Sequence, residues 1–300
     1  MELFNNISSE INGFCKTKLL DIFGSSKSVY VLNQQFNLEK FAKSVEIVSK
    51  AIDIPIYIVD NESQIFFKNI ELYIIIRNNK MVLFSSHKYY DGLSIYYILH
   101  NIDIEYSNSN EIFPLDSSIS KNKFDNNSLL NNISLFTNHL NGNDDVPEDL
   151  ILLKTVDGLK TKTSNILEEY QKLLLDFVIV IDTRNIHNIK TPTIGNYFDM
   201  YYLKNNEVPN LTNNLKKLKS TSDIPSNNFL ESKEYIFVNS LLKFPGFSFC
   251  DEVLPISQYS FNGIYIHKYY MIVGAPKRDG LSNIYVNKNL YNLLQEKNLI

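Results

Sequence analysis

The chain has 300 residues, of which 44% are hydrophobic and 21% are charged, a composition typical of a globular protein with one large or two medium domains. Its formal net charge of −4 argues against a nucleic-acid-binding surface, and its apolar runs are shorter than the ~20 residues that cross a membrane. Two cysteines make no disulfide framework, and the first residues lack a signal-peptide pattern. We therefore expect a cytoplasmic enzyme or binding protein without nucleic-acid or membrane partners.

The first clear elements are a strand followed by an amphipathic helix. Residues 28–36, "SVYVLNQQF", look like a strand. In residues 37–52, Leu38, Phe41, Val45 and Val48 recur at spacings of three and four, which places them on one apolar face.

Further strands then lead to a histidine. Two short strands are expected at 54–60 and 64–69, followed by a β-hairpin at 71–86 with an Asn-Asn turn. The second hairpin strand ends beside His87, and Asp91 can cap the apolar helix that follows.

The chain then changes character before strands resume. Residues 104–150 are rich in Asn, Ser and Asp, and we expect a long crossover that is partly helical at 128–140. A helix is predicted at 161–175. Further strands are expected at 176–182, 196–204, 234–240, 263–276 and 281–287, with a helix and then a loop at 213–228 and a closing helix at 287–297.

The motif His87-x-x-x-Asp91-Gly92 has residue types suited to catalysis. A histidine at the end of a strand can meet a substrate, and its neutral imidazole can act as a general base near neutral pH. Asp91 can fix the geometry of the turn, and Gly92 leaves room for a tight backbone passage. The alternative is a hydrogen-bonded or surface histidine with a structural role.

The order of strand, helix, strands, hairpin, His-x-x-x-Asp-Gly and helix resembles the first half of the CoA-dependent acyltransferase superfamily. Chloramphenicol acetyltransferase, the condensation domains of peptide synthetases and the BAHD acyltransferases belong to that superfamily. The BAHD pattern is the most similar. Residues 113–119, "FPLDSSI", resemble its Pro-x-x-Asp-Arg-Ser stretch, with Ser117 where Arg is usual.

The resemblance continues in order to the C-terminus. Residues 178–198 resemble the buried strand that ends in Asp-x-Arg and is followed by Gly-Asn-Tyr-Phe. Residues 238–249 resemble the Ser-Trp-x-x-(Phe/Leu)-Pro segment, with Leu241 in place of Trp. The Asp-Phe-Gly-Trp-Gly motif of the BAHD enzymes is missing, and "SFCDE" at 248–252 stands in its place.

The resemblance implies an α/β chloramphenicol acetyltransferase-like fold, with two halves of mixed β-sheet flanked by helices and a channel between them. We expect an N-terminal half at 1–125 with the histidine motif, a crossover linker at 126–160 and a C-terminal half at 161–300. Because both halves lie in one chain, we expect a monomer.

The resemblance also implies roles for individual residues. His87 would be the general base in the transfer of an acyl group from acyl-CoA to a small-molecule hydroxyl or amine acceptor. Asp91 of the same catalytic motif would not touch the substrate but would pair with Arg184 and hold the histidine loop.

Further candidates come from the C-terminal half. Asn239 or Ser240 would stabilise the oxyanion, and Asn196 would lie near the acyl group; the alternatives are packing for the first two and a turn for Asn196. Lys216, Lys217 and Lys219 are candidates for binding the CoA phosphates, or they form a solvated helix face. No cofactor is expected to be permanently bound, and because the histidines lack metal-ligand spacing, no metal site is predicted.

Other functions remain open from the sequence. The chain could be a degenerate, non-catalytic relative that acts as a binding or scaffold module. It could also be a condensation-type enzyme that uses a carrier-protein thioester. A hydrolase that pairs His87 with Ser85 or Ser86 is disfavoured because the nucleophile-elbow motif is missing.

Overall fold

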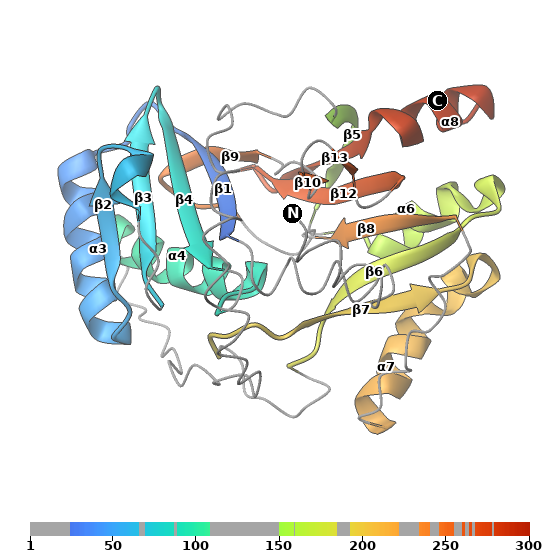
Figure 1. Ribbon diagram of the computed structural model, residues 1–300, viewed down its shortest axis with the longest axis horizontal. Coiled ribbons are helices and arrows are strands. Elements are labelled where there is room, and N and C mark those ends of the chain that lie inside the picture. Colours follow the sequence, from blue (N-terminus) through green and yellow to red (C-terminus); the bar gives the residue numbers. More distant parts are fainter. Residues whose placement is uncertain are drawn as a thin grey trace, which may run out of the picture.

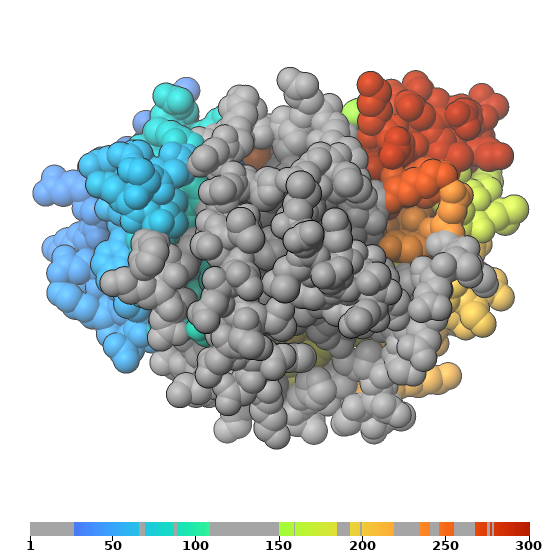
Figure 2. All heavy atoms as spheres, in the orientation of Figure 1, coloured from blue at the N-terminus to red at the C-terminus, as the bar shows by residue number. Residues whose placement is uncertain are grey.

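Two mixed β-sheets lie side by side, and helices cover one face of each (Figure 1). The computed structural model describes residues 25–65, 70–86, 89–108, 150–158, 160–184, 193–221, 234–240, 246–254, 260–261, 264–265, 268–277 and 279–300. In the space-filling view the N-terminal elements, in blue and cyan, lie at one end of the molecule and the C-terminal elements, in orange and red, at the other (Figure 2).

The first sheet has the strand order β2-β3-β4-β1-β9. Its strands are β1 (Ser25–Leu32), β2 (Ile56–Val59), β3 (Leu72–Arg77), β4 (Lys80–Ser86) and β9 (Cys250–Leu254). The predicted hairpin joins β3 to β4 through Asn78 and Asn79, whose φ angles of 50° and 59° lie in the left-handed region that asparagine tolerates in two-residue turns. The predicted strand at 64–69 is not formed at its first residue, because the 3₁₀-helix η1 (Glu62–Gln64) occupies it; residues 66–69 lie outside the described part.

Two helices pack on one face of this sheet. The predicted amphipathic helix is α3 (Leu38–Ile52), which the side chain of Asn37 caps by accepting a hydrogen bond from the Lys40 amide. Its buried apolar residues pack with those of α4 (Gly92–Ser107) over the sheet. The end of β4 and the start of α4 are thereby fixed relative to one another, and these ends flank the histidine motif. The placement of Leu38 on the buried face of α3 was wrong: at the first helical position it is 51% exposed.

The second sheet has the strand order β5-β13-β12-β8-β6-β7. Its strands are β5 (Leu150–Asp157), β6 (Asp176–Asp182), β7 (Phe198–Leu203), β8 (Tyr235–Ser240), β12 (Tyr269–Pro276) and β13 (Leu281–Asn287). Its helices are α6 (Thr163–Glu169), α7 (Leu211–Thr221) and α8 (Lys288–Glu296), with the 3₁₀-helices η4 (Gln171–Leu173) and η5 (Asn205–Asn210). The helices and one face of the sheet share a single apolar core.

Two strands depart from the expected division of the chain. Residues 150–157, which we assigned to the linker, form β5 and pair with β13 at the edge of the second sheet. Residues 250–254, which we assigned to the C-terminal half, form β9 and pair with β1 of the first sheet (Figure 1). Phe247 and Phe249 enter the first core with β9, so the chain crosses back to complete the N-terminal half.

The remaining predictions hold in part. The predicted helix at 161–175 is divided into α6 and η4, and the predicted strand at 263–276 is divided into β11 (Ile264–Tyr265), which pairs with β10 (Ser260–Phe261), and β12. The expected helical stretch at 128–140 lies outside the described residues. Within the part of the chain that the structure describes, no helix is long and apolar enough to cross a membrane.

Candidate active site

The candidate site lies where α4 begins. Asp91 has an extended backbone and caps the helix, because its Oδ1 accepts a 2.8 Å hydrogen bond from the Ser94 amide. Just before it, Tyr90 is fully buried and its hydroxyl donates to the Ile70 carbonyl. His87 precedes Asp91 by four positions and lies outside the described residues, so its catalytic role stays a prediction.

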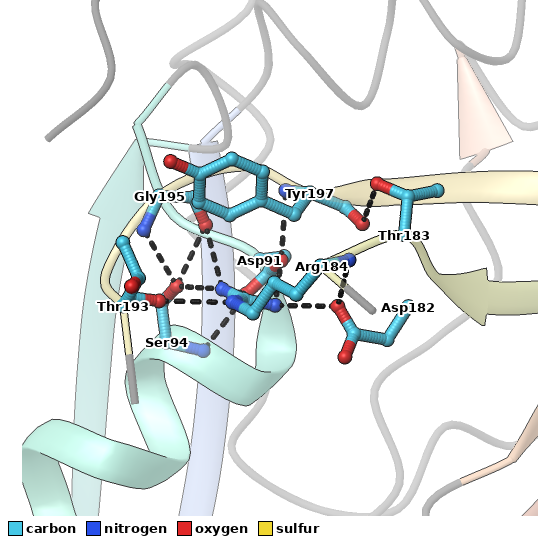
Figure 3. A network of polar contacts seen from close by, with 8 residues as sticks. All are labelled: Asp91, Ser94, Asp182, Thr183, Arg184, Thr193, Gly195 and Tyr197. Atoms are coloured by element: carbon cyan, nitrogen blue, oxygen red, sulfur yellow. Dashed lines mark hydrogen bonds and ion pairs between the residues drawn. The ribbon is translucent and has the colours of Figure 1, made fainter. Parts of the chain in front are cut away.

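Arg184 forms the predicted ion pair with Asp91. Its side chain follows β6, is 0% exposed and crosses from the second half to the start of α4 (Figure 3). Nη2 donates to Asp91 Oδ1 at 3.0 Å and Nη1 to Asp91 Oδ2 at 2.9 Å, which is the two-pronged geometry that a planar guanidinium allows. The pair therefore ties the two halves together at this point.

The other contacts of Arg184 are all with its own half or with α4. Nε donates to the Thr193 carbonyl at 2.9 Å, and Nη1 also donates to Asp182 Oδ1 at 2.8 Å. Nη2 also donates to the hydroxyl of Ser94 at 2.8 Å. Burial alone would lower the pKa of Arg184, but the nearby carboxylates of Asp91 and Asp182 outweigh burial and raise it.

The carboxylate of Asp91 is saturated with donors. Besides the two bonds from Arg184 and the one from Ser94, its Oδ2 accepts a 2.9 Å bond from the Tyr197 amide. Four donors use the lone pairs that a carboxylate offers. This geometry suits a residue that holds a loop in place and does not suit one that exchanges protons with a substrate.

The hydrogen bonds around Asp91 and Arg184 form a network in which the sequence did not predict the roles of Ser94 and Gly195, among others. Ser94 is fully buried, and its hydroxyl contacts both the amide and the carbonyl of Gly195 in the second half. A Cβ at Gly195 would lie 2.4 Å from Cε2 of Tyr197, so only glycine fits beneath that ring. The Tyr197 ring in turn lies 4.7 Å from the Arg184 guanidinium carbon, a cation–π contact.

The described residues do not crowd Gly92, and its expected role stays a prediction. Gly92 was expected to leave room for a tight backbone passage. In the described part of the chain, no heavy atom lies within 4 Å of a Cβ built at Gly92, and the residue is exposed. At Gly195, by contrast, the ring of Tyr197 lies close to where a Cβ would be.

Asn196 is the candidate substrate residue that the fold brings to the network. It lies between Gly195 and Tyr197, and both of these residues are hydrogen-bonded to the first turn of α4 or its cap. A signal for this position was present in the sequence, since "GNYF" matches the family pattern.

The two oxyanion candidates end β8 and point to opposite faces of the second sheet. Because strand side chains alternate, Asn239 shares the face of Phe237, and Ser240 shares the helix-covered face of Val238. The Ser240 hydroxyl lies 2.7 Å from that of Thr163 in α6.

The candidate CoA-binding lysines lie on α7. Lys216 and Lys217 are exposed, and the side chain of Lys219 is outside the described part. Figure 1 shows α7 at the outer end of the second half, at a distance from α4. The described residues hold no group of three His, Cys, Asp or Glu side chains placed to bind a metal ion.

Comparison with known proteins gives matches at the level of structure. No protein-family model matches the sequence, and no curated protein matches it significantly. The tallysomycin biosynthesis protein TlmII aligns with a TM-score of 0.50 and 8% identity over 91% of this chain and 91% of its own. The condensation domain of the Monacolin K polyketide synthase MokA aligns with a TM-score of 0.49 and 8% identity over 93% of this chain and 90% of its own.

F. sporotrichioides TRI101, crystallised with coenzyme A and T-2, aligns with a TM-score of 0.49 and 11% identity over 93% of this chain and 95% of its own. At these identities the likeness shows the fold alone: the chain shares the overall fold of TlmII. The expected fold class is confirmed: the described residues form two α/β halves, each a mixed sheet with helices. The Asp91–Arg184 pair lies between those halves.

Proposed function

We propose that this chain is an acyltransferase that moves an acyl group from acyl-CoA to a hydroxyl or amine on a small molecule, with His87 as the general base. The observation that carries the proposal is the buried Asp91–Arg184 pair, because it fixes the turn that follows His87 where the two halves meet. The ordered sequence resemblance supports the same reaction. A fold kept only for binding would have no need of a histidine four positions before Asp91 in the sequence.

The proposed reaction needs no covalent intermediate on the enzyme. The imidazole of His87 takes the proton from the acceptor as its oxygen or nitrogen attacks the thioester carbonyl. The tetrahedral intermediate then collapses, the bond to sulfur breaks, and the departing CoA thiolate receives the proton from the imidazolium. Asn239 or Ser240 is the candidate for donating a hydrogen bond to the oxyanion, and Asn196 would lie near the acyl group.

The remaining candidate residues would have supporting roles in this reaction. Asp91 and Arg184 would keep the histidine turn in position, and neither would touch the substrates. Lys216, Lys217 and Lys219 are the candidate contacts for the CoA phosphates. The enzyme would work as a monomer without a bound cofactor, in a channel between the halves, and we expect it in the cytoplasm.

The first prediction concerns His87. We expect His87→Ala to slow the release of CoA thiol from acetyl-CoA and longer acyl-CoAs by about 10²–10⁴-fold, the usual contribution of a general base. The measurement is thiol release with alcohol and amine acceptors. His100→Ala is the matched control, because His100 lies on α4 and stacks on Tyr96, away from the Asp91 network.

Each outcome of this assay decides between functions. Equal thiol release by the wild type and His87→Ala would exclude the proposed mechanism. Activity with a carrier-protein thioester and none with acyl-CoA would favour a condensation-type enzyme. Activity with neither donor, from folded protein, would favour a non-catalytic binding module.

A further inference from the structure

The hydroxyl of Ser94 makes all of its hydrogen bonds with the other half of the molecule. Oγ donates to the Gly195 carbonyl at 2.6 Å, and it accepts from the Gly195 amide at 2.9 Å and from Nη2 of Arg184 at 2.8 Å (Figure 3). These partners follow Ser94 by 90 to 101 positions in the chain. One hydroxyl thus uses its donor and both of its acceptor sites on two residues of the second half, Arg184 and Gly195.

This use of a helical serine differs from the usual one. A serine inside a helix commonly bonds to the carbonyl of its own preceding turn. Ser44 of α3 does so, since its hydroxyl donates to the Lys40 carbonyl at 3.0 Å and the residue is only 3% exposed. Ser94 is also buried in a helix of the first half, but it holds another segment of chain instead.

The segment that Ser94 holds carries Asn196. On one side of Asn196, the Gly195 carbonyl accepts bonds from the Asp91 amide at 3.2 Å and from Ser94. On the other side, the Tyr197 amide donates to Asp91, and the Tyr197 carbonyl accepts from the amide and the hydroxyl of Thr183. Because both neighbours of Asn196 are held, the first turn of α4 determines where its backbone lies.

We propose that Ser94 is a positioning residue that holds residues 193–197, and through them Asn196, in register with the turn that follows His87. The kinetic part of this inference rests on the proposed acyl transfer. Without the hydroxyl, the buried amide of Gly195 loses its acceptor, whereas the Gly195 carbonyl keeps its bonds from Asp91 and Arg184. The segment then shifts, and Asn196 shifts with it.

The test compares Ser94→Ala with Ser44→Ala, a matched loss of a buried helical hydroxyl in the same half. We expect the backbone amides of Gly195 and Tyr197 to exchange with solvent at least roughly tenfold faster in Ser94→Ala, because the opening that exposes them becomes easier. Exchange at these amides should be unchanged in Ser44→Ala. Unchanged exchange in Ser94→Ala would overturn the inference, and this readout does not depend on the reaction.

The kinetic arm uses a double-mutant cycle. We expect Ser94→Ala to lower kcat by roughly 10–100-fold with little change in the KM for acyl-CoA, because a small displacement of a positioned group is costly to the reaction. If Ser94 acts through Asn196, Ser94→Ala should have little further effect in an Asn196→Ala background. Full additivity of the two losses would contradict this route.

The two proposals fail in different ways. If His87→Ala is as active as the wild type, the proposed function fails, and the exchange measurement still decides whether Ser94 holds the segment. If His87→Ala is inactive while Ser94→Ala behaves as Ser44→Ala does in both measurements, only the role of Ser94 is wrong.

Discussion

Arg184 finds an acceptor for each of the five N–H groups that a guanidinium offers. The acceptors are the Thr193 carbonyl for Nε, two carboxylates for Nη1, and Asp91 and Ser94 for Nη2. A lysine ammonium has three donors on one atom and could not reach acceptors spread around a plane. Complete pairing is what makes a fully buried charge tolerable at this site.

Two glycines near the network should respond oppositely to the addition of a methyl group. Gly195→Ala would drive Cβ into the Tyr197 ring, which is buried against Arg184, so we expect a loss of about 1–3 kcal/mol in the free energy of unfolding. Gly92→Ala adds a methyl group where the described residues leave space. It should be neutral or stabilising by about 0.5–1 kcal/mol, since glycine disfavours helices.

Urea denaturation of both variants measures this difference. Similar losses in the two would show that the Tyr197 contact is not what constrains Gly195. A drop in thioester cleavage by Gly92→Ala at full stability would mean that the space at Gly92 serves a substrate.

At the scale of elements, the sequence predicted those helices and strands whose signals lie within a short stretch of chain. The helix α3 has a clear apolar face and an asparagine cap, and the β3–β4 hairpin has an Asn-Asn turn, so both were found. Strand β5 was missed because it lies at a sheet edge, and only its first residue is buried. Strand β9 was missed because its five residues include two acids and its partner β1 lies more than 200 positions away.

In the candidate site, too, some contacts could be predicted from the sequence and others could not. The motif spacing and the family resemblance were sufficient to pair Asp91 with Arg184. Ser94 and Gly195 were not predicted, because their contacts join a side chain to a backbone about a hundred positions away, and such a contact leaves no periodicity in the sequence. Such contacts can be identified only from the three-dimensional structure, in which the two halves lie against one another.

Residues 246–254, in which the chain crosses back to the first sheet and forms β9, should contribute strongly to the stability of the first half. We call these residues the crossing segment. Phe249 is fully buried in the first core, with its ring 5.2 Å from the rings of Phe41 and Phe247. We expect Phe249→Ala to lower the free energy of unfolding by about 3–5 kcal/mol, as truncation of a buried phenylalanine does. Leu38→Ala is the control, because Leu38 is 51% exposed on α3, and it should change stability by less than about 0.5 kcal/mol.

Circular dichroism in urea measures both variants. A loss in Phe249→Ala no larger than that in Leu38→Ala would mean that the crossing segment contributes little. A second, separate transition in Phe249→Ala would mean that the halves unfold independently once this contact is removed.

At the scale of the whole molecule, the halves are joined by the Asp91–Arg184 network and along the segment that leads into β9. In that segment the Ser248 amide donates a 2.7 Å hydrogen bond to Asp103 of α4, and the Phe249 carbonyl accepts one from the Asn33 amide. From β9 itself, Glu252 accepts a 2.7 Å bond from Asn283 of β13. Because these contacts lie at different elements, relative rotation of the halves would break several buried polar contacts at once. We therefore expect the halves to behave as one cooperative unit.

Buried tyrosines throughout the molecule predict how its stability depends on alkaline pH. Burial raises the pKa of Tyr30, Tyr90 and Tyr170 well above the ordinary value of 10.0, and burial with a nearby Asp103 raises that of Tyr96 to about 12. Their phenols stay neutral in the fold but ionise in the unfolded chain, so their contribution is fully present below pH ~10 and is lost as pH rises further. Each such tyrosine contributes a slope of about 1.4 kcal/mol per pH unit between its unfolded and folded pKa values.

Urea denaturation between about pH 8 and pH 11 measures this loss. Tyr90→Phe should remove one tyrosine's share of the slope above pH ~10, while it also lowers stability at every pH because the bond to the Ile70 carbonyl is lost. Tyr57→Phe, which removes the hydroxyl of a 48% exposed tyrosine, is the matched control. A stability that stays constant up to pH ~11 would contradict the prediction, because neutral buried phenols require that unfolding release protons there.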